Sequence, residues 1–586
     1  MTAAFTDSNG PRLAAYIAER EKQVDQPLGL PGVELDFQGY HTQVPNGTHV
    51  HSTRTALDYA MALLAEGSPA SVTKARAAML KALALQDQST GSATFGIWPW
   101  FFEEPLSAMR PPDWNWADFC GIRIAHILCR YGEAMDADLR DKAARALRDA
   151  AWSIFRRNVG PHYTNIAVKG GVVAIVAGEY LGDAFLLRYG RERLEGFVAH
   201  TRTNGGFTEY NSPNYGVLVL VEVERGLLLV KDEASRAALR AIHGEFWRMA
   251  AVSLHLPTGQ LCGPHSRSYS NLLGLNPSRV IGEGLGQPLF RCMPADGESE
   301  KEGALDTILI PRVPCPDEIR NRVLEAAAQP EKERRVRVNF TRMETTPASE
   351  SSAPKRMARV GTFWSQGDAC IGSVNCDNVW QQRRPVIGYW RVGDAVAVLR
   401  VRLRHARNDL ACGFLQTVQE GPELLSACTL VTDRGDSHDH LDRPADGVFR
   451  LTELALAIEL DAPGATMGAA TGDGAYTMQA GDHCVDIHPV MAEFGGYSVE
   501  WCAVPTATGV ALKALINGGE AVELTPSAMR DVCIGFHLRV RRADSGAEII
   551  SKRVEKREDY IALSVDSSRA HFDLSVPRTP RPLPLP

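Results

Sequence analysis

The sequence predicts a multidomain protein in which an all-helical part is followed by an all-β part. Residues 53–310 repeat apolar side chains at three- and four-residue spacing, the period of an amphipathic helix. Residues 356–575 instead hold short alternating segments rich in Val, Ile, Thr and aromatic side chains. The length of 586 residues exceeds what a single hydrophobic core normally organises. We therefore expect a helical domain at 1–310 and a β domain at 356–575.

The helical segments of the N-terminal part are separated by glycine or proline clusters. Examples are "TRTALDYAMALLAEG", "NIAVKGGVVAIVAGEYLG" and "GVLVLVEVERGLLLV". Helices of similar length joined by short turns pair as antiparallel hairpins. Hairpins stacked side by side can close into a ring, so we expect an incomplete (α/α) toroid.

A charged, proline-bearing connector predicts a linker at 311–355. The strand-like segments after it include "VIGYWRVGDAVAVLRVRL", "DGVFRLTELALAIELDAP" and "VCIGFHLRVRR", with Gly and Asp turns between them. A series of such strands predicts an antiparallel β-sandwich. The proline-rich end at 576–586 predicts an extended or disordered tail.

Composition narrows the class of protein. Hydrophobic residues make up 44% and charged residues 23% of the chain, as in an ordinary globular protein. The net charge of −7 is mild and no long basic run occurs, so we expect no nucleic-acid partner. No run of about 18 apolar residues predicts a membrane span, and no secretory signal is evident. The twelve cysteines are scattered singly, which favours reduced thiols and a cytoplasmic location.

Five stretches of the helical part are dense in polar and aromatic side chains and lie at predicted helix ends or in loops, where scaffolds expose their working residues. They are Phe95–Pro105, Pro111–Gly121, Asn158–Gly171, Gly205–Gly216 and Thr258–Gly274.

The first two stretches hold four tryptophans within nineteen positions: Trp98, Trp100, Trp114 and Trp116. One interpretation is a platform for sugar rings, because pyranose C–H groups pack on indoles while a side chain such as Asn115 bonds the hydroxyls. The other interpretation is a core cluster beneath a long loop.

Three of the stretches resemble a known family. "DWNWADFCG", "PHYTNIAVKGG" and "YNSPNYGVLVL" are similar to motifs of hyaluronate and chondroitin lyases, within the toroid-plus-sandwich polysaccharide lyases that include heparinase II/III-like and oligoalginate lyases. The similarity covers about residues 95–275. It implies a cleft whose floor holds Asn, His, Tyr and Arg. It also implies that Asn165 binds the uronate carboxylate and that Tyr215 is the general acid or base.

One departure from that pattern concerns the histidine, which the family places about nine residues before the tyrosine. Here that position is Gly206. The imidazole would have to come from His162 or from His265, and the sequence leaves both open.

The chemistry of β-elimination explains why such residue types are needed together. The proton at C5 of a uronate is barely acidic while the adjacent carboxylate is ionised, so the enzyme must neutralise that charge. Asn165 with Arg267 or a histidine can do so. A tyrosine near cations can have its pKa lowered enough to act as base or acid. Tyr215 is the first candidate and Tyr269 the second.

The loop before Tyr215 has two interpretations. Glycines and Pro213 can fix a bend that directs Glu209, Asn211 and Tyr215 into a cleft. Alternatively, Asn211 and Ser212 cap the following helix. The two roles are compatible.

In "HSRSY", alternation predicts that His265, Arg267 and Tyr269 share one side of an extended segment and face an anionic sugar. The alternative is a polar connecting loop. His49 and His51 alternate in the same way, and we expect them to be structural.

Two stretches of the β part also carry polar side chains. Arg383, within "QQRRP", is expected to reach over the ring and contact substrate. His438 and His440, flanking Asp439, could bind a metal, but two histidines two positions apart are a weak signal and a solvated turn is the favoured interpretation. We expect neither a metal nor a cofactor.

The leading hypothesis is a carbon–oxygen lyase that acts on an acidic oligo- or polysaccharide, and a homodimer is compatible with it. One alternative is an inverting glycoside hydrolase that uses Glu209 with Asp113 or Asp118, whose carboxyl groups would have to lie roughly 6.5–9.5 Å apart. Another is a non-catalytic carbohydrate-binding protein.

Overall fold

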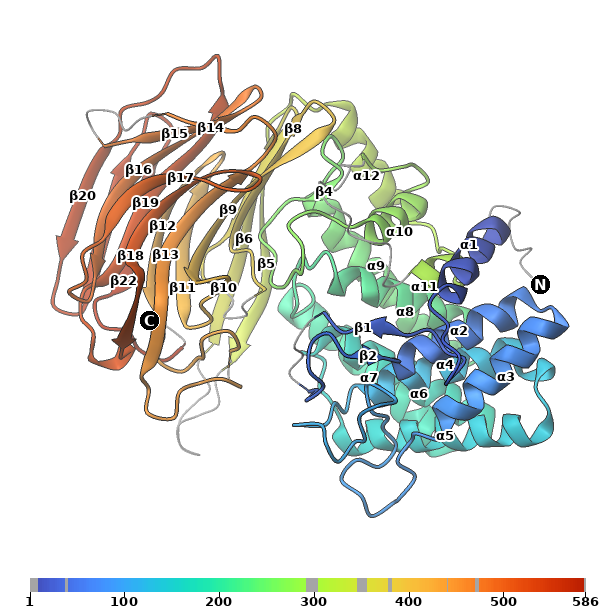
Figure 1. Cartoon of the computed structure of the whole chain (residues 1–586). Helices are drawn as coiled ribbons and strands as arrows, with labels where there is room; N and C mark the ends of the chain where they lie inside the picture. Colours follow the sequence, from blue (N-terminus) through green and yellow to red (C-terminus); the bar gives the residue numbers. More distant parts are fainter. Residues whose placement is uncertain are drawn as a thin grey trace. The chain divides into compact units, whose positions relative to one another are not determined.

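The computed structural model describes residues 9–36, 41–290, 304–344, 356–377, 382–439, 441–468 and 474–583. The chain divides into two compact units, each made of several separate segments. Figure 1 shows the helices and strands that form them. The first unit comprises residues 1–202, 217–246 and 299–314, and the second comprises 203–216, 247–298 and 315–586. Each unit is described by itself below.

Helices build the first unit, which confirms the helical prediction for this part of the chain. They are α1 (Asn9–Glu21), α2 (Thr53–Glu66), α3 (Pro69–Leu83), α4 (Trp116–Tyr131), α5 (Ala137–Arg157), α6 (Thr164–Leu181), α7 (Ala184–Asn204), α8 (Tyr215–Leu229), α9 (Glu233–Ser253) and α11 (Ala304–Leu309), and the last residues of α7 and α9 and the first of α8 fall in the second unit. A short hairpin pairs β1 (Val33–Glu34) with β2 (His49–Val50). Closure of the helices into a toroid stays a prediction.

Local sequence sets the ends of these helices. Ser52 caps α2 by accepting a hydrogen bond from the Thr55 amide, and Gly67 ends that helix with a left-handed φ of 83°. None of the described helices combines the length and apolar character of a membrane span.

Ion pairs are buried between helices of the first unit. Lys169 on α6 lies 2.7 Å from Glu222 on α8, and Arg225 lies 3.1 Å from Glu222 and 2.5 Å from Asp306 on α11. Lys169, Glu222 and Arg225 are at most 3% exposed. Because an unpaired charge is very unfavourable at such burial, these groups hold the helices in register.

Antiparallel sheets dominate the second unit, which confirms the β-rich prediction. Among the described residues, nine strands form one sheet: β5 (Arg334–Glu344), β6 (Arg356–Gln366), β7 (Ala369–Val374), β8 (Val386–Val392), β9 (Ala395–His405), β10 (Asn408–Asp409), β13 (Phe449–Asp461), β17 (Glu500–Pro505) and β18 (Gly509–Leu524). Six form another: β11 (Gly413–Glu420), β12 (Glu423–Leu430), β14 (Thr466–Met467), β15 (Tyr476–Ala480), β16 (His483–Phe494) and β19 (Val532–Arg542). A third contains β20 (Ser551–Lys556), β21 (Tyr560–Asp566) and β22 (His571–Pro577).

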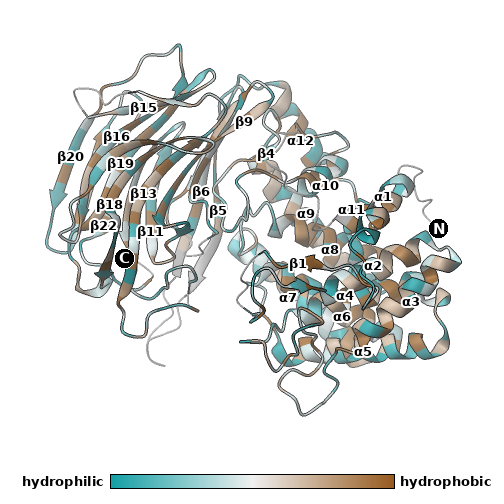
Figure 2. Cartoon of the chain, in the orientation of Figure 1, coloured by the Kyte–Doolittle hydropathy of each residue, from teal (hydrophilic) through white to brown (hydrophobic). Residues whose placement is uncertain are grey.

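Successive side chains of a strand point to opposite faces of its sheet, so one strand contributes to two hydrophobic cores. On β12, Leu424 belongs to a core that also takes Leu456 from the nine-stranded sheet, whereas Leu425 belongs to a core with Leu563 of β21. Strand β22 buries alternate residues along most of its length. Figure 2 colours the strands by the hydropathy of their residues. The term sandwich stays a prediction.

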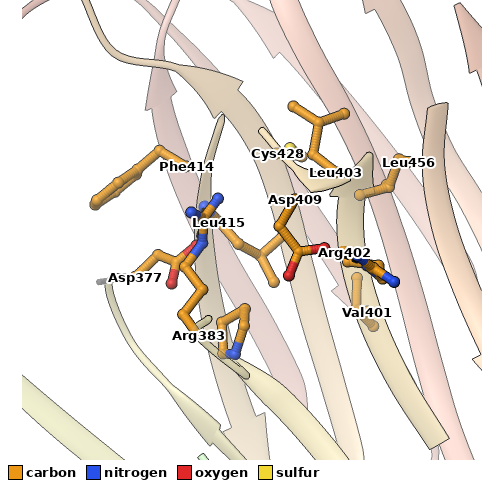
Figure 3. A pocket seen from close by; sticks show the side chains of 11 residues that line it. Asp377, Arg383, Val401, Arg402, Leu403, Asp409, Phe414, Leu415, Cys428 and Leu456 are labelled. Carbon is orange, nitrogen blue, oxygen red and sulfur yellow. Dashed lines mark hydrogen bonds and ion pairs between the residues drawn. The ribbon is translucent and has the colours of Figure 1, made fainter. Parts of the chain in front are cut away.

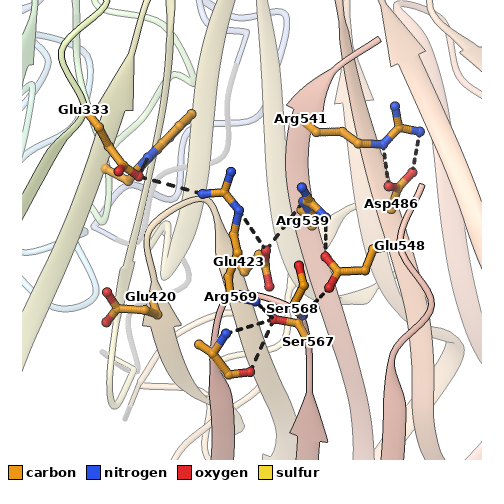
Figure 4. Close-up of polar contacts among 12 residues, drawn as sticks. Glu333, Glu420, Glu423, Asp486, Arg539, Arg541, Glu548, Ser567, Ser568 and Arg569 are labelled. Atoms are coloured by element: carbon orange, nitrogen blue, oxygen red, sulfur yellow. Dashed lines mark hydrogen bonds and ion pairs between the residues drawn. The ribbon is translucent and has the colours of Figure 1, made fainter. Parts of the chain in front are cut away.

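Charged side chains between strands of the second unit are paired in the same way (Figure 4). Glu423 has no exposed surface and lies 3.5 Å from Arg539 and 3.6 Å from Arg569. Arg541 lies 2.6 Å from Asp486 on the neighbouring strand. Each carboxylate is therefore neutralised by a guanidinium from outside its own strand.

The residues predicted as a linker and a tail contain ordered structure. Helix α12 (Asp317–Ala328) and strand β5 lie within 311–355. In the proline-rich end, Arg581 pairs with Val431 and Leu583 is 7% exposed. The predicted domain boundaries themselves stay a prediction.

Candidate functional site

Two tyrosines meet at the N-terminus of α8. The hydroxyl oxygens of Tyr215 and Tyr269 lie 2.5 Å apart, and their ring centroids lie 5.9 Å apart. Tyr215 is 7% exposed, whereas Tyr269 is 61% exposed. In this phenol pair, Tyr269 therefore faces solvent and Tyr215 lies behind it.

A guanidinium lies over the inner ring of the phenol pair. The Cζ of Arg267 is 4.4 Å from the ring centroid of Tyr215. Its Nη1 lies 3.2 Å from Glu209, and its Nε donates to the side-chain oxygen of Gln382 at 2.6 Å. Glu209 and Gln382 thus fix the position of the cation that covers Tyr215.

Burial sets the protonation state of Tyr215. It raises the pKa of Tyr215 above the ordinary value for a phenol, and Arg267 opposes this only in part. The prediction that nearby cations lower this pKa is therefore wrong, because desolvation outweighs the attraction of one guanidinium. Tyr215 is a neutral phenol at physiological pH and can donate a proton or a hydrogen bond.

Hydrogen bonds, most of them to residues 262–267, hold the loop that carries Tyr215. The Ser212 hydroxyl accepts from the Tyr215 amide at 3.0 Å and donates to the Arg267 carbonyl at 2.5 Å, which confirms its capping role. The Asn211 amide donates to the carbonyls of Cys262 and Pro264 at 2.7 and 2.8 Å. The structure thus gives Asn211 a tethering role in place of the predicted contact to substrate.

Neighbouring atoms leave no room for a side chain at the two glycines before this loop. Gly205 has a φ of 82°, and a Cβ there would lie 2.4 Å from the Asn339 carbonyl oxygen. A Cβ at Gly206 would lie 2.9 Å from the sulfur of Met249. Any larger side chain at position 206 would displace the Met249 side chain.

His265 does not present an imidazole to solvent. It is 2% exposed, and its Nε2 donates to the Leu261 carbonyl at 2.9 Å. Burial lowers its pKa to about 4, so the ring is neutral. The predicted grouping therefore holds for Arg267 and Tyr269, which both contact Tyr215, whereas His265 is buried apart from them. Its predicted catalytic role stays a prediction.

Sequence reasoning missed Asn214, which orients the outer phenol. Its side-chain oxygen accepts from the Tyr269 amide at 3.0 Å and from the Ser268 hydroxyl at 3.3 Å. The only signal in the sequence is its position next to Tyr215.

Asn165 and His162 lie in the first unit. Asn165, in the first turn of α6, is 2% exposed, and its side-chain oxygen has no hydrogen-bond partner among the described residues. His162 is exposed in the loop before that helix. Their predicted roles in binding a carboxylate and moving a proton stay predictions.

The four tryptophans lie in three different environments. Trp98 has no exposed surface and donates to the Ala82 carbonyl at 3.0 Å, so it is a core residue and its predicted role in a sugar platform is wrong. Trp100 and Trp116 stack with centroids 5.1 Å apart and an interplanar angle of 30°. Trp114 is partly exposed and donates to the Ala93 carbonyl.

Trp100 and Trp116 line a cavity of about 270 Å³ within the first unit. Its other charged and aromatic lining residues are Tyr16, Arg20, Glu34, Asp36, Arg54, Asp58, Phe101, Arg123 and Asp306. Asp58 is paired with Arg123 at 2.6 Å, and the Arg54 guanidinium lies over the Phe119 ring. Indole faces beside guanidinium groups suit a sugar that carries a negative charge.

Polar side chains next to the tryptophans have partners in the first unit. The Asn115 side chain donates to the Tyr163 hydroxyl at 3.2 Å and accepts from Arg157 at 2.6 Å. Asp113 accepts from the Trp100 indole at 3.1 Å and from the Asn115 amide at 3.0 Å. Asp113 therefore orients the Trp100 indole.

Asp118 is 2% exposed, and burial raises its pKa to about 7 although Arg193, Arg157 and Lys169 oppose that shift. Its carboxyl group is thus close to half-protonated at neutral pH.

Arg383 is structural (Figure 3). Its Nε lies 2.7 Å from Asp377, and its Nη2 donates to the carbonyls of Leu410 and Gly413. Because it is 5% exposed among the strands, the prediction that it contacts substrate is wrong. Its neighbour Gln382 reaches the site instead, through Arg267.

His438 pairs with Asp439 at 2.8 Å, whereas His440 lies outside the described residues.

Comparison with known proteins gives limited similarity. A family model described as a domain of unknown function (DUF8769) matches residues 36–275. No curated protein matches the chain. Similar solved structures include a heparinase III, at 10% identity over 98% of this chain and 92% of that chain with a TM-score of 0.47. They also include a heparinase III (BT4657 gene product), at 9% identity over 90% and 84% with a TM-score of 0.40. A chondroitin AC lyase of Streptomyces coelicolor A3, solved in complex with chondroitin sulphate, shares 11% identity over 92% and 97% with a TM-score of 0.35.

Proposed function

We propose that the protein is a polysaccharide or oligosaccharide lyase that cleaves uronic-acid-containing glycans by β-elimination. The observation that carries this proposal is the phenol pair: two tyrosine hydroxyls 2.5 Å apart, with the Arg267 guanidinium 4.4 Å from the inner ring. The arrangement combines a solvent-facing proton carrier, a second phenol behind it and a cation.

The proposed reaction removes the C5 proton of the uronate and expels the C4 oxygen. The electrons of the C5–H bond form a C4=C5 double bond, the C4–O bond breaks, and the leaving oxygen takes a proton. Tyr269, as the exposed phenol, exchanges the proton with substrate, and the neutral Tyr215 stabilises the tyrosinate form of Tyr269 by donating a hydrogen bond to it. Arg267 stabilises negative charge on the same pair.

The substrate-binding part of the proposal uses residues of the first unit. Stacked Trp100 and Trp116 support a sugar ring, and Arg54 attracts an acidic group. For the first unit by itself, the family resemblance implies that Asn165 binds a carboxylate group of the glycan. The proposal includes an incomplete helical toroid, a β-sandwich and a cytoplasmic location.

The hydrolase alternative receives less support, because its carboxyl groups already have structural roles. Glu209 is paired with Arg267, and Asp113 accepts two hydrogen bonds that orient Trp100 and Asn115. Asp118 has a pKa suited to an acid but is 2% exposed. A non-catalytic binding protein would have no use for the phenol pair.

The test is incubation of the purified full chain with a panel of uronate-containing oligosaccharides. Ultraviolet absorbance of the conjugated unsaturated uronate and the amount of new reducing ends are both followed. A lyase produces the two signals in equal amounts. Reducing ends without absorbance would instead establish a hydrolase, and binding without either signal would establish a non-catalytic protein.

A further inference from the structure

Three side chains that can bind a metal converge near the N-terminus of the first unit. Asp25 lies in the loop after α1, His49 lies on β2, and His51 follows that strand. One ligand atom from each lies within 4.8 Å of the other two. The Oδ2 of Asp25 is 2.6 Å from the Nε2 of His51 and 3.3 Å from the Nε2 of His49.

The surrounding residues hold two of these side chains in position. The other oxygen of Asp25 accepts from the Leu28 amide at 3.2 Å, which turns Oδ2 toward the histidines. The Nδ1 of His51 lies 2.6 Å from Glu103, whose second oxygen accepts from the His51 amide at 3.0 Å. A carboxylate behind a histidine, on the nitrogen that does not face the metal, is the usual outer support of a metal ligand.

A glycine leaves the space between the two imidazoles open. A Cβ at Gly32 would lie 2.3 Å from the Nε2 of His49 and 2.8 Å from the Nε2 of His51. Any larger residue at position 32 would therefore collide with the two imidazole nitrogens that face Asp25. His51 is 5% exposed and His49 is 49% exposed, so the cluster has a buried side and a side open to solvent.

We propose that Asp25, His49 and His51 form a binding site for one divalent transition-metal ion, of which Zn²⁺ fits the ligands best. Two imidazole nitrogens and one carboxylate oxygen form a ligand set that Zn²⁺ accepts, with water from the open side as the fourth ligand. Binding replaces the direct contact between Asp25 and His51 with two bonds of about 2.0–2.2 Å to the ion. The proposal departs from the expectation of no metal, which considered only His438, His440 and Asp439, and from the expectation that His49 and His51 are structural.

The ion would stiffen one wall of the cavity described above. His49 is the cross-strand partner of Glu34, and Glu34 lines that cavity together with Leu35 and Ser52. An ion bound to Asp25 and His49 ties the loop after α1 to the β1–β2 hairpin. In this proposal the ion orders one side of the cavity and takes no part in the elimination chemistry. The proposal therefore does not rest on the proposed function.

The test uses full-length protein treated with a chelator and then titrated with Zn²⁺ by calorimetry. We expect one ion per chain and a higher thermal unfolding midpoint in the ion's presence. Substituting Co²⁺ for Zn²⁺ should give visible absorption bands typical of four-coordinate Co²⁺. His49→Ala and Asp25→Asn should each weaken Zn²⁺ binding by at least about 100-fold, and Glu103→Gln by about 10- to 100-fold.

The matched control is His571→Ala, since His571 is also exposed and lies 2.6 and 2.9 Å from two carboxylates but has no second imidazole. This variant should bind Zn²⁺ like the wild type. His49 is half exposed, so its loss should leave the circular dichroism spectrum unchanged. The proposal is overturned if the wild type binds no ion stoichiometrically, or if His49→Ala and Asp25→Asn bind as tightly as the control.

Discussion

At the residue scale, burial raises the pKa of Tyr215 and the Arg267 guanidinium lowers it, and the effect of burial is larger. Its neutral phenol is buried behind the exposed Tyr269, so the two hydroxyls have different tasks although they touch. In the proposed reaction, the exposed phenol exchanges a proton with the substrate and the buried phenol donates a hydrogen bond to the exposed one.

Removing either hydroxyl should abolish most turnover. Tyr269→Phe and Tyr215→Phe are each expected to lower kcat by about 10²–10⁴-fold, the usual contribution of a positioned acid or base. Substrate affinity measured by calorimetry should change little, because both rings remain. Tyr497→Phe is the control, since its exposed hydroxyl donates to the Glu523 carbonyl and lies outside the phenol pair. Equal activity of all three variants would remove the phenol pair from the mechanism.

Asp118 should make stability depend on pH. Burial raises its pKa from 3.8 to about 7, so the folded chain binds a proton that the unfolded chain releases. The stabilisation is complete below about pH 4 and is lost as the pH rises to about 7, with an upper limit of about 4 kcal/mol.

Thermal unfolding of wild type and Asp118→Asn between these pH values tests this linkage. The midpoint of the wild type should fall relative to that of the variant as the pH rises. Parallel curves would show that Asp118 does not titrate in this range.

At the scale of elements, periodicity predicted most of the architecture. Segments such as those forming α2, α6 and α8 repeat apolar residues at helical spacing, and those forming β13 and β19 alternate, because helix and strand each expose one face to a core. The contacts of polar loop residues could not be predicted. The tether of Asn211 to Cys262 and the ion pair of Arg383 with Asp377 join positions that local pattern does not relate.

The loop before α8 depends on a glycine that packs on β5. Gly205→Ala should destabilise the chain by on the order of 1–3 kcal/mol or more, because its φ is positive and its Cβ would meet a backbone oxygen. It should also lower kcat, since the loop carries Tyr215. Gly196→Ala, an exposed helical glycine with open space around it, should be neutral or slightly stabilising in the same unfolding assay. Comparable unfolding midpoints for the two variants would contradict the packing argument.

At the scale of the whole molecule, each of the two units is built from segments that are separated in the sequence, which no local pattern indicates. Residues 203–216 and 247–298 fall in the second unit, although they lie between helices of the first. The residues that carry the phenol pair are therefore packed with the sheets, although the sequence predicted a helical domain for them. Stability of the first unit instead depends on charges buried between its helices.

Breaking that buried network should be costly. Glu222→Gln leaves Lys169 and Arg225 undercompensated and should cost about 3–5 kcal/mol. Lys142→Gln removes an exposed pair with Asp138 and should cost at most about 1 kcal/mol. Urea unfolding of both variants compares the two cases, and similar losses would show that the network is not critical.

The most direct test of the central claim is digestion of a responsive uronate oligosaccharide in water labelled with heavy oxygen, followed by mass spectrometry of the fragments. Elimination breaks the C4–O bond without adding water, so the account predicts that cleavage adds no label to either fragment beyond the exchange seen at the reducing end of an uncleaved control. One labelled oxygen incorporated per bond cleaved would show hydrolysis and contradict the account.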